Sequence, residues 1–134
     1  MRASWCVLVV LVALAASGCG GANDASMDPG ADCLQCHATA GSGPAPAFSA
    51  AGTVFRIDGS GAAAVVVTLS DGNSVQVSTV TNSVGNFYFA EALTPPLRVE
   101  LDDGAAVKAM ARATGACNSC HAEDGSAAWP VLLP

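Results

Sequence analysis

Two short stretches of the chain carry the same set of chemically reactive side chains. They read DCLQCHATAG and ACNSCHAEDG, and they place two thiols and an imidazole at Cys33, Cys36 and His37 and again at Cys117, Cys120 and His121. The chain contains only these two histidines. Thiols at this spacing can close a disulfide, bind a metal ion or attach a prosthetic group, and the adjoining imidazole can ligate a metal.

The histidine that follows each cysteine pair separates these alternatives. Two disulfides are the usual arrangement of four cysteines in an exported protein, but they leave both histidines without a role. A zinc site made of four thiolates has the same shortcoming. Cys-x-x-Cys-His is the attachment motif of c-type haem, in which the thiols bond to the porphyrin and the histidine ligates the iron. The sequence therefore predicts two covalently bound c-type haems, with iron ligands at His37 and His121.

Both ends of the chain thus resemble a c-type cytochrome, and the resemblance covers only the two motifs. A single-haem cytochrome domain wraps several helices around its porphyrin. Residues 20–48 and 114–134 are each too short to do this alone. We therefore expect the haems to pack against each other or against the central segment, and to be more exposed than in a compact helical cytochrome.

Methionine is the candidate for the sixth position of each iron, because the chain has no third histidine. Apart from the initiator, the chain contains Met27 and Met110, and each precedes a motif closely. In AVKAMAR, residues 106–112, apolar side chains alternate with Lys108, Met110 and Arg112. This alternation predicts that Met110 lies on the polar face of a strand, where a haem would cover its thioether and the two cations would meet haem propionates.

The N-terminal stretch MRASWCVLVVLVALAASGC is typical of an export signal, because one arginine precedes an apolar run that is too short to span a bilayer comfortably. Its end, ALAASGC, resembles the lipobox of bacterial lipoproteins. The resemblance implies that residues 1–18 are removed and that Cys19 is acylated, which would anchor the protein on a membrane of the cell envelope. Gly20 after this cysteine is compatible with delivery to the outer membrane. Cleavage by an ordinary signal peptidase would instead leave Cys19 as a free thiol.

The central segment reads as short strands separated by turn residues such as DGSG, SDGN and DDG. Six strands are expected, at residues 53–57, 64–69, 75–81, 87–90, 97–101 and 106–112. Alternation is clearest in the fifth, with Leu97, Val99 and Leu101 on one face. The sequence predicts a mainly β fold, a small antiparallel Greek-key β-sandwich over residues 49–113. Residues 19–48 then form the lipid tether and first haem segment, and residues 114–134 form the second.

GTVF, AAAVVVTL, TVTNSVGNFYF and PPLRVEL together resemble the carboxypeptidase regulatory-like, or prealbumin-like, β-sandwich. This family implies a non-catalytic module that is sometimes associated with carbohydrate. Carbohydrate binding stays open here, although Tyr88 is the only tyrosine. The turn at Asp102 and Asp103, and the spacer at residues 41–52, carry no catalytic pattern.

The formal net charge of −6 argues against nucleic acid or anionic lipid as a partner and favours a basic protein, such as a redox partner, or no electrostatic partner at all. Because no further catalytic group accompanies the two predicted haems, we expect an electron-transfer protein rather than an enzyme. Two alternatives stay open: a haem-based sensor or enzyme with one open iron position, and a redox-silent envelope module with disulfides or a zinc site. An even number of antiparallel strands between the motifs would bring both motifs to the same end of the sandwich.

Overall fold

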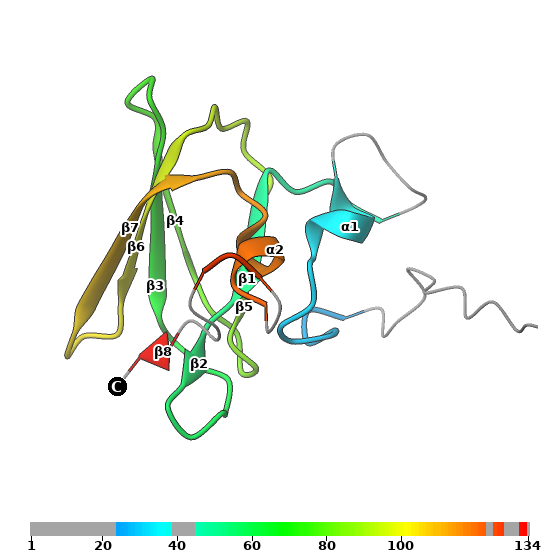
Figure 1. The fold of residues 1–134 in the computed structure, drawn as a ribbon, viewed down its shortest axis with the longest axis vertical. Helices are drawn as coiled ribbons and strands as arrows, with labels where there is room; N and C mark the ends of the chain where they lie inside the picture. Colours follow the sequence, from blue (N-terminus) through cyan, green and yellow to red (C-terminus); the bar gives the residue numbers. More distant parts are fainter. Residues whose placement is uncertain (1–23, 39–44, 123–124, 128–131, 134) are drawn as a thin grey trace, which may run out of the picture.

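The computed structural model describes residues 24–38, 45–122, 125–127 and 132–133. Within them the fold is mainly β, with eight strands and two helices of one turn each (Figure 1). In chain order the elements are α1 (Leu34–His37), β1 (Ala50–Thr53), β2 (Phe55–Arg56), β3 (Val66–Ser70), β4 (Gln76–Val80), β5 (Asn86–Phe89), β6 (Leu97–Asp102), β7 (Val107–Ala113), α2 (Cys117–Cys120) and β8 (Leu132–Leu133).

One layer of the sandwich is an antiparallel sheet in the order β4-β3-β6-β7. The alternation predicted for β6 is confirmed, because Leu97, Val99 and Leu101 are buried while the residues between them are not. In β3, Val67 and Leu69 are buried beside them. These side chains form the inner face of the sheet.

The second layer is the antiparallel pair β1 and β5, which buries Phe87 and Phe89 against the first sheet. The chain leaves the first sheet between β4 and β6 to form β5, and β6 then returns beside β3. This is a Greek-key connection, so the predicted sandwich is confirmed. One pair departs from the antiparallel expectation, because β2 and β8 run parallel.

The strand expected at residues 53–57 is wrong in its bounds. The structure has β1 and β2 there, separated by the buried Val54, and β1 begins at Ala50 inside the expected spacer. The backbone N–H of Val54 donates to the carbonyl of Gly85, and its carbonyl accepts from Ala62. These two bonds turn the chain away from the partner strand β5, so one apolar run becomes two short strands.

The turn between β6 and β7 agrees with its sequence interpretation. Asp102 accepts a hydrogen bond from the backbone N–H of Gly104, and Asp103 accepts from the N–H groups of Ala105 and Ala106. The bonds from Ala106 and Ala105 lower the pKa of Asp103. Both carboxylates therefore cap a hairpin and do not form an acid–base pair.

Residues 24–31 are fastened to the end of the sandwich by asparagine side chains. Asn86 donates to the carbonyls of Met27 (2.9 Å) and Ala25 (3.3 Å), and Asn82 also donates to Ala25. Thr53 accepts from the backbone N–H of Gly30 at 2.8 Å. The described residues contain no helix that is long and apolar enough to cross a membrane.

Candidate functional site

The first motif forms a single helical turn that places its histidine in the protein interior. Cys33 precedes α1, and the backbone N–H of His37 donates to the carbonyl of Cys33 at 2.9 Å. The His37 side chain is buried, with 8% of its surface exposed. Its carbonyl accepts from the N–H of Phe48, which joins the end of α1 to the chain just before β1.

One ring nitrogen of His37 forms a hydrogen bond with the backbone. Its Nδ1 lies 2.8 Å from the carbonyl oxygen of Pro46. Because a carbonyl only accepts, Nδ1 carries the proton and donates. The basic lone pair is then on Nε2, the tautomer in which metal-ligating histidines are usually held by their second hydrogen bond. The geometry therefore suits an iron ligand at Nε2.

Three rings stack in a row beginning at this imidazole. The His37 and Phe48 ring centroids are 4.4 Å apart with 13° between the ring planes, and Phe48 and Tyr88 are 4.4 Å apart at 20°. His37 is buried, whereas 52% of the Tyr88 side chain is exposed. The stack thus joins the interior of the first motif to the surface.

The second motif closes the free edge of β1. The N–H of Ala51 donates to the carbonyl of Gly115 (3.0 Å), and the N–H of Thr53 donates to the side-chain oxygen of Asn118 (3.2 Å). Gly115 has a φ of +103°, and a side chain there would collide with the carbonyl of Ser49. Glycine therefore lets the chain run along the strand edge before it turns into α2.

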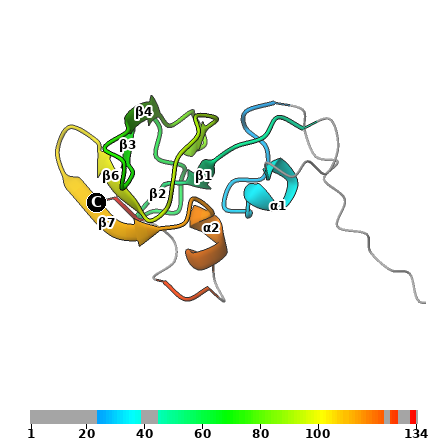
Figure 2. The ribbon, with the colours of Figure 1, turned by 90° about the horizontal axis from the view of Figure 1, so that it is seen from above.

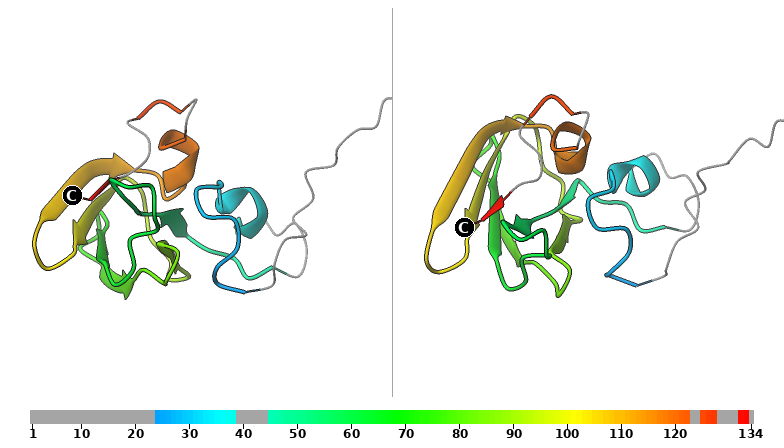
Figure 3. Two further views of the ribbon diagram at one scale, coloured as in Figure 1. Left: turned by 90° about the horizontal axis from the view of Figure 1, so that it is seen from below. Right: turned by 60° about the horizontal axis from the view of Figure 1, so that its bottom comes forward.

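Asn118 also joins the two motifs to each other. Its amide nitrogen donates to the carbonyl of Ala31 at 2.7 Å and to the hydroxyl of Thr53 at 3.2 Å. Asn118 and Thr53 are both buried. Figures 2 and 3 show α1 and α2 next to each other, outside the four-stranded sheet. The motif segments lie together, as expected, but the strand count behind that expectation is wrong, because seven strands (β1–β7) and not six separate them.

The imidazole of the second motif faces the predicted sulfur ligand. His121 Nε2 lies 3.5 Å from the sulfur of Met110 on β7. These two side chains, with Cys117, line a cavity of about 250 Å³ between β7 and the edge of β1. Val54, Phe87, Val99 and Leu101 form its apolar wall. Two side chains of kinds that ligate haem iron therefore meet one of the predicted attachment thiols at an apolar opening of the sandwich.

The expected face of β7 is wrong. Met110 pairs with Val99 and Lys108 pairs with Leu101, so both lie on the inner face of the sheet. Ala109 and Ala111, expected on the core side, are exposed. Lys108 does line the cavity, as a propionate partner would. Arg112 does not, because it occupies an irregularity in the β6–β7 pairing with a φ of +69°.

The cysteines differ in their environments. Cys33, Cys117 and Cys120 are free thiols, and Cys36 is disulfide-bonded, so neither motif is closed by a disulfide between its own cysteines. Burial of its sulfur, followed by the proximity of Cys33, raises the pKa of Cys117 to about 12. No group of three or more potential metal ligands occurs among the described residues.

Gly52 has no side chain, and Cys117 packs into the space that a side chain there would occupy. A methyl group on Gly52 would lie 2.8 Å from the Cβ of Cys117 and 3.1 Å from the ring of Phe87. Both distances are shorter than ordinary van der Waals contact. The absence of a side chain in the middle of β1 is therefore what lets the second motif approach the core.

The structure does not bring Met27 to a motif histidine. Its carbonyl is held by Asn86, and neither described imidazole has Met27 among its hydrogen-bond or ring contacts. Cys19 and the expected signal peptide lie outside the described residues. Sequence reasoning missed Pro46, Asn118, Thr53 and Asn86, which position the motifs. Comparison with protein-family models, curated proteins and solved structures gives no match.

The donor set fits the group that the motifs imply. His37 offers Nε2, and His121 offers a nitrogen opposite the Met110 thioether. The apolar cavity walls suit a porphyrin face, and Lys108 at the same cavity suits an acidic substituent. Cys36 is disulfide-bonded, and it could attach a haem only after reduction to the free thiol.

Proposed function

We propose that this protein is an exported, membrane-anchored di-haem c-type cytochrome that carries electrons in the bacterial cell envelope. The observation that carries the proposal is the meeting of His121, Met110 and Cys117 at one apolar cavity. Met110 lies on β7, 11 residues before His121, and the turn of the chain into α2 brings the two side chains together. A disulfide or zinc module would not require this convergence.

When bound, each haem supplies an iron that accepts and releases one electron. The chain's own residues set the conditions for that exchange. Pro46 fixes the His37 tautomer, and Phe48 covers the face of the His37 ring. Val99 and Leu101 exclude water from one side of the second site. Asn118 holds the two motif segments together, so haems carried by them would lie near each other, which would favour electron exchange.

The anchor is proposed from the sequence at Cys19, which would keep the cytochrome on a membrane through acyl chains. Cells that express the chain should show a covalently haem-stained band in the membrane fraction. Cys19→Ala should move that band to the soluble fraction with the same staining intensity. An unstained band contradicts the haem proposal, and a stained variant that stays with the membrane contradicts the anchor alone.

A further inference from the structure

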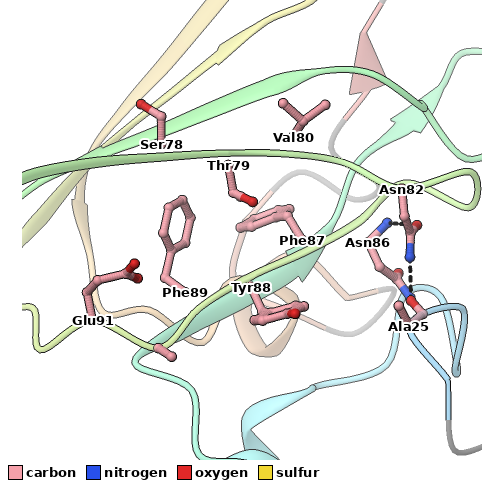
Figure 4. A pocket seen from close by; sticks show the side chains of 11 residues that line it. Ala25, Ser78, Thr79, Val80, Asn82, Asn86, Phe87, Tyr88, Phe89 and Glu91 are labelled. Atoms are coloured by element: carbon pink, nitrogen blue, oxygen red, sulfur yellow. Dashed lines mark hydrogen bonds between the residues drawn. The ribbon is translucent and has the colours of Figure 1, made fainter.

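The row of stacked rings at the first motif runs from the protein interior to the surface. It begins at buried His37, continues through Phe48 and ends at Tyr88, and the two successive centroid distances are both 4.4 Å. Figure 4 shows Tyr88 on the side of β5 opposite Phe87 and Phe89, which stand between β5 and β4. The phenol ring is therefore the surface end of a continuous aromatic contact that begins at a proposed iron ligand.

Lysine and arginine are absent from described residues 24–38 and from β5, whereas the four-stranded sheet carries charges of both signs. All four described lysine and arginine residues lie on β2, β6 or β7, at Arg56, Arg98, Lys108 and Arg112. The segment that carries the first motif contains only acidic charges before His37, at Asp24, Asp28 and Asp32. Glu91 follows the strand that carries Tyr88 and is exposed. Glu91 lines the same pocket as Tyr88, so the described charge nearest the end of the stack along β5 is acidic.

We infer that Tyr88 is the point at which electrons leave or enter the haem at His37, and that its surface docks a redox protein with a basic face. The inference rests on the proposed function. In the outward step the ferrous iron at His37 becomes ferric, and one electron passes to the partner's one-electron acceptor. No proton moves, because the rings provide electronic overlap without themselves being oxidised. Opposite charge steers the basic partner to this side.

The test is the rate of electron transfer from the mature, haem-loaded protein to a strongly basic ferric monohaem cytochrome c, measured by stopped flow at low salt. Tyr88→Leu removes the aromatic ring and keeps an apolar side chain, and it should slow transfer several-fold with both midpoint potentials unchanged. Tyr88→Phe keeps the ring and should transfer at the original rate. The Cys117→Ala/Cys120→Ala background, in which the haem at His37 remains alone, repeats the comparison without a second route.

Two further readouts separate the stack from the docking surface. Isotope-labelled tyrosine gives one ring resonance set, since Tyr88 is the only tyrosine, and Phe48→Leu should shift it by removing the neighbouring ring current. Glu91→Gln should slow association with the basic cytochrome more than Glu100→Gln on β6 does.

Equal transfer rates for Tyr88→Leu and Tyr88→Phe would overturn the exit point, and equal effects of the two glutamine variants would overturn the docking surface. A purified chain without haem would overturn the proposed function itself. These failures are distinguishable, because the haem content is read before any rate is measured.

Discussion

The two Cys-x-x-Cys-His motifs share one spacing and differ in what surrounds the histidine. His37 is buried, donates to Pro46 and stacks on Phe48. His121 is half-buried and faces Met110, whose side chain is 36% exposed, at an opening of the sandwich. In the proposed cytochrome, the motif supplies the attachment thiols and one iron ligand, whereas the fold supplies the second ligand and sets the exposure of the site. Two haems with the same attachment chemistry should therefore have different potentials.

The largest expected effect is the loss of one of the two proposed haems. Cys33→Ala/Cys36→Ala should abolish the first haem and Cys117→Ala/Cys120→Ala the second, because each pair supplies both thioether bonds of one haem. Each variant should keep half of the covalent staining on a denaturing gel. The combination of all four substitutions should stain not at all. Full staining of either pair variant would rule out attachment at that motif.

The next largest effect is expected on the midpoint potential of the second haem alone. Met110→Ala removes the sulfur that lies opposite His121, and sulfur ligation favours ferrous iron. One of the two midpoint potentials should fall, within the roughly 0.8 V range that axial ligands span, and carbon monoxide should bind newly at that haem.

Met27→Ala is the matched control for Met110→Ala, because it removes the other methionine. Its sulfur is not in contact with a described imidazole, so both potentials should stay as they are. A redox titration in which Met110→Ala also changes neither potential would remove Met110 from the site.

A smaller effect, on stability, is expected from substitution of Asn118, which hydrogen-bonds to the segment of the first motif from the second. Asn118→Ala leaves the buried N–H of Thr53 without its partner, which should lower the free energy of unfolding by about 1–3 kcal/mol. The neighbouring Ser119 is exposed and bonds only locally, so Ser119→Ala should change stability by about 0.5 kcal/mol or less. Urea unfolding of the haem-loaded protein measures both. Equal midpoints for the two variants would show that Asn118 does not fasten the motifs.

The sandwich was predictable to the extent that its signals are local. The alternation at Leu97, Val99 and Leu101 can be recognised from the sequence alone, and the turn at Asp103 can be recognised from its neighbouring residues. The break at Val54 was not, because it depends on hydrogen bonds to Gly85 and Ala62. Strand bounds fail where a distant segment decides them.

The candidate site divides in the same way. The motif residues are recognisable from their spacing, whereas Asn118 occupies an unspecified motif position and acts on Ala31, far away in the chain. Met110 was predicted as an iron ligand from its place on the polar face of a strand; its sulfur lies beside His121, but its face was misjudged. Parity was counted from apolar neighbours in β7, and the cross-strand partner Val99 decides it instead.

The most direct test of the central claim is the intact mass of the purified, exported protein under denaturing conditions. Two covalently bound haems per chain, with no zinc, is the predicted result, and the Cys117→Ala/Cys120→Ala variant should retain one. A chain whose mass includes no haem would contradict the proposal that these two motifs make this protein a di-haem cytochrome.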